Sequence, residues 1–329
     1  MTEEPIPDVL VVGGGVIGAS VAHALAVRGA AVTLLADGAP GATMAAAGML
    51  CPSFEAMQTG GRTLAAMGAR SLALWDGFAG GLADDPARAL GYDRSGVIGV
   101  GYPPAKLTGA PVPVPDGLEA GRAVLVEGEG QVDPRLLLAA LEVACARAGV
   151  RRVRGRAASL LVEDDQVGGA ALTDGSALRA SRTVVASGAG ALVPGLALHA
   201  VRGRAFLVRN TLSLTRVVRS PSVYLAPKPN GTLYVGATEE EEGASRDGPA
   251  APEGLWSEAL WLAPSLRGAA VLARFDGLRP RTADELPVIG RHEALGGLWV
   301  AGGHHRNGVL LAPLTARMIA DDVLSGPAA

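Results

Sequence analysis

The chain of 329 residues has only two cysteines, Cys51 and Cys145, which lie far apart in the sequence and form no CxxC pair. Its five histidines show no metal-ligand spacing with cysteines or carboxylates. Disulfide frameworks and zinc sites both require closely patterned ligands. We therefore predict a reducing compartment and no bound metal.

The chain also lacks a net positive charge, and it has few aromatic side chains. The formal net charge is -3, no basic block occurs, and aromatic residues make up 4% of the chain. Nucleic-acid binding needs a basic surface, and binding of single strands needs aromatic platforms as well. We expect no nucleic-acid partner.

The chain shows no targeting or membrane segment. Residues 1–5 are acidic and lack the basic and then apolar pattern of a secretion signal, which predicts a cytoplasmic protein. The run 9–27 is almost uncharged and long enough to resemble a membrane span. Four glycines near its start and the polar His23 favour a buried strand followed by a helix instead.

Several catalytic motifs are missing. The sequence contains no G-x-S-x-G elbow, no H-E-x-x-H and no Walker lysine after a glycine loop. Hydrolase, zincin and phosphoryl-transfer chemistry are therefore disfavoured. Redox chemistry on a bound cofactor remains, because the cofactor carries the difficult step and the protein mainly orients the substrate.

Two glycine-rich stretches at opposite ends of the chain, 13–18 and 301–308, are the most informative features present. The first follows a strand-like run, 8–12, and opens an apolar helix pattern that continues to Arg28. In such a GxGxxG, Gly13 permits the tight turn, Gly15 lets the main chain approach a pyrophosphate, and Gly18 lets the helix lie close to the strand. This context predicts a dinucleotide site.

The second stretch has the same form of strand, turn and helix, with strand 298–301 before it and a helix over about 309–324 after it. We predict that both loops hold one extended ligand and that the nucleotide lobe is built from both ends of the chain. A third small-residue loop, 187–190, follows strand 182–186, although an ordinary turn explains it equally well.

A second strand over 31–35 completes the first strand-helix-strand unit. The position that usually carries an acidic residue for the ribose hydroxyls is Ala36. Asp37 follows it and is a candidate substitute, but a shift of one residue reverses the side-chain direction in a strand.

The middle of the chain has a different pattern. The proline- and glycine-rich region 103–118 predicts an irregular connection between lobes. A good turn signal, 229–231, joins strands 223–226 and 232–235 into a hairpin of an antiparallel substrate lobe. The other expected elements are helices over 62–75 and 133–148, the latter with Asp133 as N-cap, and strands over 97–100, 158–162, 169–172 and 271–275.

Several of these segments resemble the glycine oxidases of the D-amino-acid oxidase family of FAD enzymes. The resemblance spans nearly the whole chain, and the segments 45–50 and 305–313 carry it most specifically. Segments 11–18, 43–50, 130–135, 235–238, 277–282 and 305–313 match.

The resemblance implies an α/β fold with an α+β second lobe: a Rossmann-type FAD-binding domain (1–85, 128–200 and 275–329) and an antiparallel-sheet substrate domain (86–127 and 201–274). It also implies oxidative deamination of glycine or a similar small amino acid by hydride transfer to non-covalent FAD, with oxygen reduced to hydrogen peroxide. In many bacteria the glycine imine feeds thiamine thiazole synthesis.

The resemblance also assigns residues. Arg279 becomes the carboxylate anchor, with Tyr224 and Arg306 as further substrate groups. An arginine fork binds a carboxylate through two parallel bonds. The predicted FAD contacts are Gly13, Gly15, Val16, Ile17, Gly18, Asp37, Thr43, Ala47, Gly48, Met49, His304, His305, Arg306, Asn307, Gly308, Val309 and Leu310.

Each assignment has an ordinary structural alternative. Arg279 could pair with Asp276 or Asp284, and Tyr224 could be a strand aromatic facing the core. We interpret His304 and His305 as loop structure, because hydride transfer from a neutral amine needs no general base.

Alternative activities also remain open at this point. They are a D-amino-acid dehydrogenase that passes electrons to a quinone, a sarcosine-type oxidase, and a flavin-binding protein without turnover. Covalent flavin would support the second of these, but Met44 occupies the loop where some relatives carry a linking histidine. A homo-oligomer stays open as well.

Three positions depart from the family pattern. Ala36 replaces a glutamate to the FAD ribose, which puts cofactor affinity in question. Ser222 and Glu239 stand where glycine oxidases have a histidine and a less polar residue near the substrate. A buried Glu239 would favour a substrate bearing an amine, whereas the charge run 239–242 is typical of a solvent-facing segment.

Overall fold

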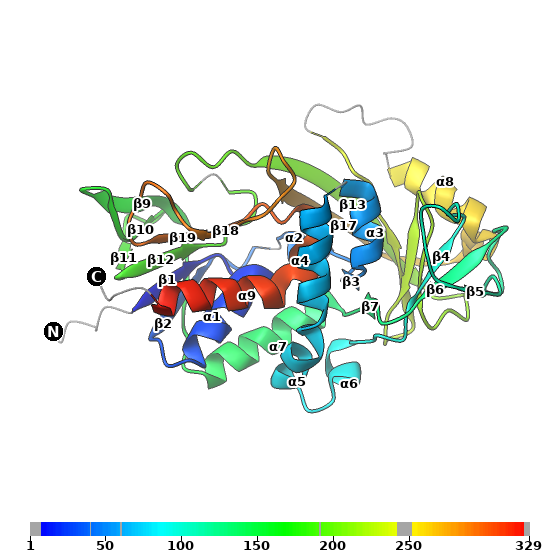
Figure 1. The fold of residues 1–329 in the computed structure, drawn as a ribbon, viewed down its shortest axis with the longest axis horizontal. Helices are drawn as coiled ribbons and strands as arrows, with labels where there is room; N and C mark the ends of the chain where they lie inside the picture. Colours follow the sequence, from blue (N-terminus) through cyan, green and yellow to red (C-terminus); the bar gives the residue numbers. More distant parts are fainter. Residues whose placement is uncertain (1–7, 40, 60, 191, 242–251, 326–329) are drawn as a thin grey trace. The chain divides into compact units, whose positions relative to one another are not determined.

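The computed structural model describes residues 8–39, 41–59, 61–190, 192–241 and 252–325. The acidic start at 1–5 and Glu242 lie outside these ranges. The chain divides into two compact units (Figure 1). Unit 1 comprises Met1–Thr43, Leu137–His199 and Arg279–Ala329, and unit 2 comprises Met44–Leu136 and Ala200–Leu278.

Unit 1 is built on a six-stranded sheet in the order β18-β19-β12-β1-β2-β8. The strands β19, β12, β1, β2 and β8 run parallel, and β18 is an antiparallel edge. The central strands are buried, apolar runs, because helices cover one face of the sheet and the segment 157–180 covers the other. Their bounds are β1 Val9–Val12, β2 Val32–Ala36, β8 Arg151–Arg154, β12 Arg182–Val185, β18 Val288–Arg291 and β19 Leu298–Gly302.

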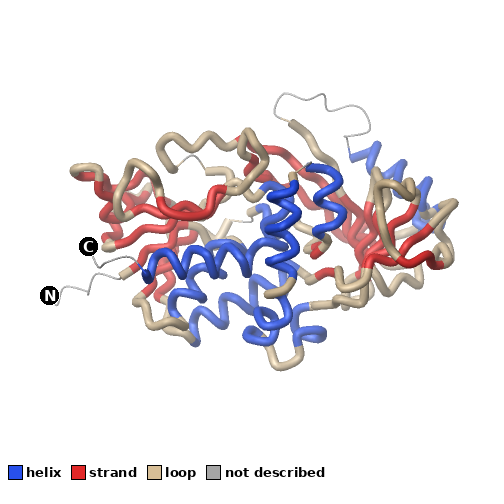
Figure 2. The backbone as a smooth tube through the Cα atoms, in the orientation of Figure 1, coloured by secondary structure: helices blue, strands red, loops and turns tan. Residues whose placement is uncertain are grey.

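Three helices belong mainly to unit 1: α1 (Val16–Ala26), α7 (Pro134–Arg147) and α9 (Gly308–Ser325). Helices α1 and α9 lie side by side although they come from opposite ends of the chain (Figures 1 and 2). Their buried faces meet the sheet in one apolar core. The run 9–27 is thus a strand and a helix, as predicted, and no helix in the described ranges is long and apolar enough to cross a membrane.

The predicted strands 158–162 and 169–172 are confirmed as β9 (Ala157–Glu163) and β10 (Gln166–Leu172), which form a three-stranded antiparallel sheet with β11 (Ala177–Arg179). The N-cap prediction for α7 fits the structure, because Asp133 Oδ1 accepts a hydrogen bond from Arg135 N at 2.9 Å.

Unit 2 contains most of an eight-stranded sheet in the order β17-β13-β16-β15-β14-β4-β6-β5. From β13 to β5 its neighbouring strands are antiparallel, except that β14 and β4 are parallel. The predicted hairpin is confirmed, with β15 and β16 joined by 228–231. The bounds are β4 Val97–Val100, β5 Ala110–Val112, β6 Ala123–Val126, β13 His199–Arg209, β14 Val217–Arg219, β15 Tyr224–Pro227, β16 Thr232–Gly236 and β17 Val271–Arg281.

Region 103–118 was predicted to be an irregular connection, and this is wrong at β5, which pairs with β6. β5 is an edge strand, so Pro111 can lack an N–H there without breaking an inner ladder. The predicted helix 62–75 ends early, at Leu72, and a second helix begins at Trp75 after a turn.

The remaining elements of unit 2 are short, and α2 begins within unit 1. They are α2 Ala42–Ala45, α3 Pro52–Thr59, α4 Arg62–Leu72, α5 Trp75–Leu82, α6 Pro86–Leu90, α8 Pro252–Leu262, the 3-10 turn Pro264–Gly268, and the two-stranded sheet of β3 (Met49–Leu50) and β7 (Gly130–Gln131). The resemblance implied that 44–85, 128–136, Ala200 and 275–278 belong to the nucleotide domain, whereas packing groups these residues with unit 2.

Candidate cofactor and substrate sites

The first glycine loop leaves no room for side chains. A Cβ on Gly18 would lie 1.8 Å from the Gly13 carbonyl oxygen, and one on Gly13 would lie 2.3 Å from the Ala186 oxygen. Gly13 also has φ +117°, which disfavours other residues. The loop therefore brings α1 against the ends of β1 and β12, as the dinucleotide motif requires.

The start of α1 is suited to an anion. Its N-cap, Gly15, supplies no capping side chain, and the first turn contains no acidic residue. Thr43 Oγ1 accepts a hydrogen bond from Val16 N at 3.1 Å, so Thr43 lies at this helix start, and its FAD contact stays a prediction. Free N–H groups and the helix dipole attract phosphate charge, so this loop fits the pyrophosphate of FAD.

The parallel strands of unit 1 end at one edge of the sheet. β1 lies between β2 and β12, so the chain reverses its order here, and ligands of such sheets bind at this switch point. The loops after β1, β12 and β19 all leave from this edge. Gly303 in the last of them has φ +75°, and a Cβ there would lie 2.6 Å from Thr282 Cγ2. The structure thus brings both predicted glycine loops together.

The ribose position has no acidic side chain facing the loop. The Ala36 side chain faces Gly14, where an added Cβ would lie 2.5 Å from Ala36 Cβ. The Asp37 side chain is exposed, and its Oδ1 accepts a hydrogen bond from Ala39 N at 3.0 Å. A role for Asp37 at the ribose stays a prediction.

The residues of the second loop are mostly buried. The turn His305–Asn307 leads directly into α9, and His305 has φ +48°, a conformation that costs a non-glycine residue about 1 kcal/mol. His304 is 5% exposed, and its Nε2 lies 2.9 Å from Thr315 Oγ1. Burial lowers the pKa of His304 to about 4, so the ring is neutral at pH 7.

The buried His304 predicts a dependence of stability on pH. The pKa of His304 is about 4 in the folded protein and about 6.5 in the unfolded chain. Between pH 4 and pH 6.5 the unfolded chain therefore binds more protons, so the free energy of unfolding falls as the pH drops through this range. The full loss is about 3 kcal/mol. We expect the free energy of unfolding, measured by urea denaturation, to fall less over this range in His304→Asn than in the native chain. Equal pH dependence in both proteins would contradict this origin.

In unit 2 the segment 45–50 is held against β7. Met49 pairs with Gln131 in a short ladder, and Val132 N donates to the Gly48 oxygen at 2.9 Å. Gly48 has φ +78°, and a Cβ there would lie 2.1 Å from the Val132 oxygen. The predicted FAD contacts of Ala47, Gly48 and Met49 therefore belong to an ordered, tightly packed segment.

Tyr224 is partly buried at the start of β15. Its ring packs on Gly236, where a Cβ would lie 2.7 Å from the ring and hydroxyl atoms. The ring stacks on Tyr234 with centroids 6.1 Å apart, and the Arg219 guanidinium lies 5.8 Å from its centroid. Its substrate role stays a prediction.

The proposed carboxylate anchor, Arg279, lies near the end of β17 and is partly buried. The two carboxylates considered as its partners have other contacts. Asp276 lies 2.7 Å from Arg202 Nη1 and 3.2 Å from Arg204 Nε, and Asp284 Oδ1 accepts a hydrogen bond from Leu286 N at 3.1 Å.

The charge run near the hairpin is only partly exposed. Glu239 is exposed, so it does not form the buried acidic group considered from the sequence. Glu240 is the buried member, and Arg204 lies 3.2 Å from its carboxylate. Ser222 is exposed and its Oγ donates to Glu258 Oε2 at 2.9 Å.

The sequence analysis missed the buried charges of unit 2. Arg219 Nη1 lies 2.6 Å from Glu55 Oε1, and both side chains are buried. Glu129 lies nearby, and burial raises its pKa to about 7 although Ser53 N donates to it. Burial also lowers the pKa of Lys228 to about 7. Near these residues the sequence offered only the family-like segment 130–135. It did not predict the buried charges, because a single charged residue in a strand or turn is normally exposed.

Comparison with known proteins agrees with this architecture. The family model "FAD dependent oxidoreductase" matches residues 8–322. A glycine oxidase from Geobacillus kaustophilus is 33% identical over 95% of this chain and 92% of its own. A bifunctional protein ThiO/ThiG from Nostoc sp. is 32% identical over 95% of this chain, which spans 52% of that protein.

The crystal structure of glycine oxidase from Geobacillus kaustophilus has a TM-score of 0.83 and 30% identity, and the match covers 99% of this chain and 96% of that one. Iminodiacetate oxidase from Chelativorans sp. shares the fold, with a TM-score of 0.85, 24% identity and 97% and 96% of the chains covered. The predicted α/β fold with an antiparallel second lobe is confirmed. The chain is an enzyme that uses FAD and belongs to the D-amino-acid oxidase family of FAD-dependent oxidoreductases.

Proposed function

We propose that this enzyme catalyses the oxidative deamination of glycine or a similar small amino acid. The observation that carries the proposal is the full-length similarity to glycine oxidases, combined with the glycine loops at the switch point of unit 1. Bound FAD supplies the acceptor for the hydride of the substrate α carbon, and oxygen regenerates it with release of hydrogen peroxide.

We assign the substrate carboxylate to Arg279, with Tyr224 and Arg306 as further anchors. A guanidinium fork fixes a carboxylate in one plane and so fixes the direction of the α carbon. The amine enters in its neutral form, loses its proton as the hydride leaves, and becomes an imine that water hydrolyses. His304 is buried, its Nε2 lies 2.9 Å from Thr315 Oγ1, and burial lowers its pKa to about 4, so the ring is a weak base and we assign it to loop structure.

The proposal extends to the cellular role. Similarity to bifunctional ThiO/ThiG proteins supports a product, glycine imine, that feeds thiamine thiazole synthesis. We also propose non-covalent FAD, because Met44 replaces the linking histidine of some relatives. We propose a cytoplasmic location, because Cys51 and Cys145 are both free thiols, as is usual in a reducing compartment.

The first experiment is the visible spectrum of the purified protein before and after anaerobic addition of glycine. Oxidised-flavin bands that bleach with glycine are the expected result. Bands that persist with glycine but bleach with another amine would show that this other amine, and not glycine, is the substrate. A flavin that no amine reduces would favour a binding protein without turnover.

The ribose position gives a further prediction. Because the side chain at 36 faces the glycine loop, Ala36→Glu should add a charged hydrogen bond to the ribose and lower the Kd for FAD about tenfold. Fluorescence titration of the apoprotein measures this Kd. Asp37→Ala is the companion variant. If it raises the Kd about tenfold while Ala36→Glu changes nothing, Asp37 already serves the ribose and the Ala36 prediction is wrong.

A further inference from the structure

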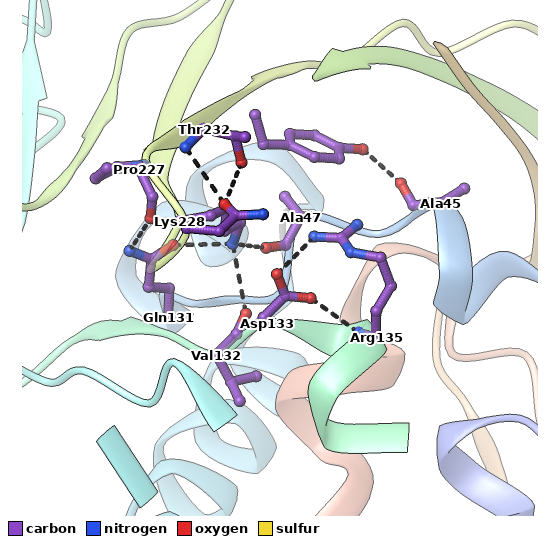
Figure 3. Close-up of polar contacts among 11 residues, drawn as sticks. Ala45, Ala47, Gln131, Val132, Asp133, Arg135, Pro227, Lys228 and Thr232 are labelled. Carbon is purple, nitrogen blue, oxygen red and sulfur yellow. Dashed lines mark hydrogen bonds and ion pairs between the residues drawn. The ribbon is translucent and has the colours of Figure 1, made fainter. Parts of the chain in front are cut away.

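Lys228 is one of two lysines in the chain and is 6% exposed. Its Nζ donates to the Ala47 oxygen at 2.6 Å and to Gln131 Oε1 at 2.9 Å, with a longer contact to the Val132 oxygen at 3.5 Å (Figure 3). An ammonium group has three donors, and three oxygens surround this one. The steps proposed above do not use it.

Tyr234 makes a second contact of the same kind. Its hydroxyl donates to the Ala45 oxygen, and its ring is 1% exposed. The ring stacks on Phe275, with centroids 5.5 Å apart, and also on Tyr224, with centroids 6.1 Å apart. Tyr234 therefore contacts both the segment 45–50 and the proposed substrate tyrosine.

Both donors come from one hairpin. Lys228 directly follows β15 and Tyr234 lies in β16, and together they bind carbonyls two residues apart in one segment. Gln131 Nε2 donates to the Pro227 oxygen at 2.8 Å, which ties β7 to the same hairpin. The hairpin thus holds the segment from one side while β7 pairs with it.

We propose that Lys228 and Tyr234 are positioning residues for FAD, which fix the direction of the peptide groups in segment 45–48 that FAD contacts. This inference rests on the proposed FAD contacts of Ala47, Gly48 and Met49. A peptide unit is planar, so a bond to the Ala45 or Ala47 oxygen also fixes the N–H of the following residue, Ala46 or Gly48.

Gly48 explains why segment 45–48 needs such hydrogen-bond donors. Its φ of +78° is a conformation that glycine leaves easily, so the backbone alone does not hold the segment in one state. Donors that fix the carbonyls before FAD arrives reduce the ordering cost of binding. Without a donor, each buried carbonyl would turn toward another partner and carry its N–H with it.

The test compares Lys228→Met, Tyr234→Phe and the double variant with Arg94→Met as a matched control. Arg94 also donates to main-chain carbonyls of unit 2, at Gly128 (2.7 Å) and Leu72 (3.2 Å), but neither belongs to segment 45–50. For each protein we would measure the Kd for FAD, the visible circular dichroism of the bound flavin and the thermal unfolding of the apoprotein.

We expect each single variant to raise the Kd for FAD about tenfold and the double variant about a hundredfold. The visible circular dichroism should change in all three, since it reports the flavin surroundings. Arg94→Met should lower the unfolding temperature while it leaves the Kd and the flavin spectrum unchanged. Tyr234→Phe removes the hydroxyl donor but keeps the aromatic stack. If Lys228→Met does not fold, the Kd of Tyr234→Phe for FAD alone tests the proposal.

The proposal is overturned if Tyr234→Phe and Lys228→Met bind FAD as the native protein does. It is also overturned if Arg94→Met weakens FAD binding equally, because the effect would then be a general loss of packing. Failure of glycine to reduce the native flavin would contradict the proposed activity alone, since the Kd for FAD is measured without substrate.

Discussion

Arg279→Ala should yield a protein that keeps its FAD but oxidises glycine about 1000-fold less efficiently in kcat/KM. Loss of one partner from a hydrogen-bonded charge pair costs about 4 kcal/mol, which corresponds to this factor. With the amine neutral, the carboxylate is the only charged group of glycine, so no remote binding group compensates. Steady-state oxygen consumption and the flavin spectrum of the same sample measure the two properties.

Two companion variants sharpen this test. Arg279→Lys keeps the charge but loses the planar fork, so we expect an intermediate kcat/KM. Arg274→Ala is the control, because Arg274 lies on the same strand, β17, with its guanidinium 5.8 Å from the Phe206 ring centroid. Native kcat/KM in Arg279→Ala, or an equal loss in Arg274→Ala, would remove Arg279 as the anchor.

Gly18→Ala should abolish FAD binding and lower the free energy of unfolding by about 3 kcal/mol or more. The added methyl group would lie 1.8 Å from the Gly13 carbonyl oxygen, which is main chain and cannot rotate away as a side chain could. Helix α1 must then move off β1, and its first N–H groups leave the position that suits a pyrophosphate. Isothermal titration with FAD and urea denaturation test both effects.

Gly77→Ala is the matched control for this substitution. Gly77 also lies in a helix, α5, but an added Cβ there meets no atom within 4 Å. Alanine in a helix is favoured over glycine, so stability should rise by about 0.5 kcal/mol and FAD should bind as before. Tight FAD binding by Gly18→Ala would show that the close approach of α1 is dispensable.

The local sequence pattern was sufficient to predict the strands and glycine loops of the nucleotide unit. The glycine loop 13–18, the apolar strands on either side and the returning strand 298–301 carry signals within a few residues. Parallel strands buried on both faces leave few alternatives for such runs. The hairpin 223–235 was equally predictable, because the turn signal 229–231 lies between two strand-like runs. Sequence also pointed to Arg279, Arg306 and Tyr224, but only through resemblance to a family.

The sequence could not reveal β5 as an edge strand or the division of the chain between units. Pro111 reads as a strand breaker locally, and only the pairing with β6 shows that its missing N–H lies at an edge. The family resemblance implied that segment 44–85 belongs to the nucleotide domain, whereas its packing groups it with unit 2.

By itself, then, the sequence determined the dinucleotide loop, the family and the chemistry that the family performs, because these depend on short stretches of particular residues. Only the tertiary structure decided which charges are buried. Lys228, Arg219 and Glu240 look like surface residues in the sequence, and Glu239 next to Glu240 is indeed exposed. Burial of a charge depends on partners far away in the chain, such as Ala47 for Lys228 and Glu55 for Arg219, and no local pattern records them.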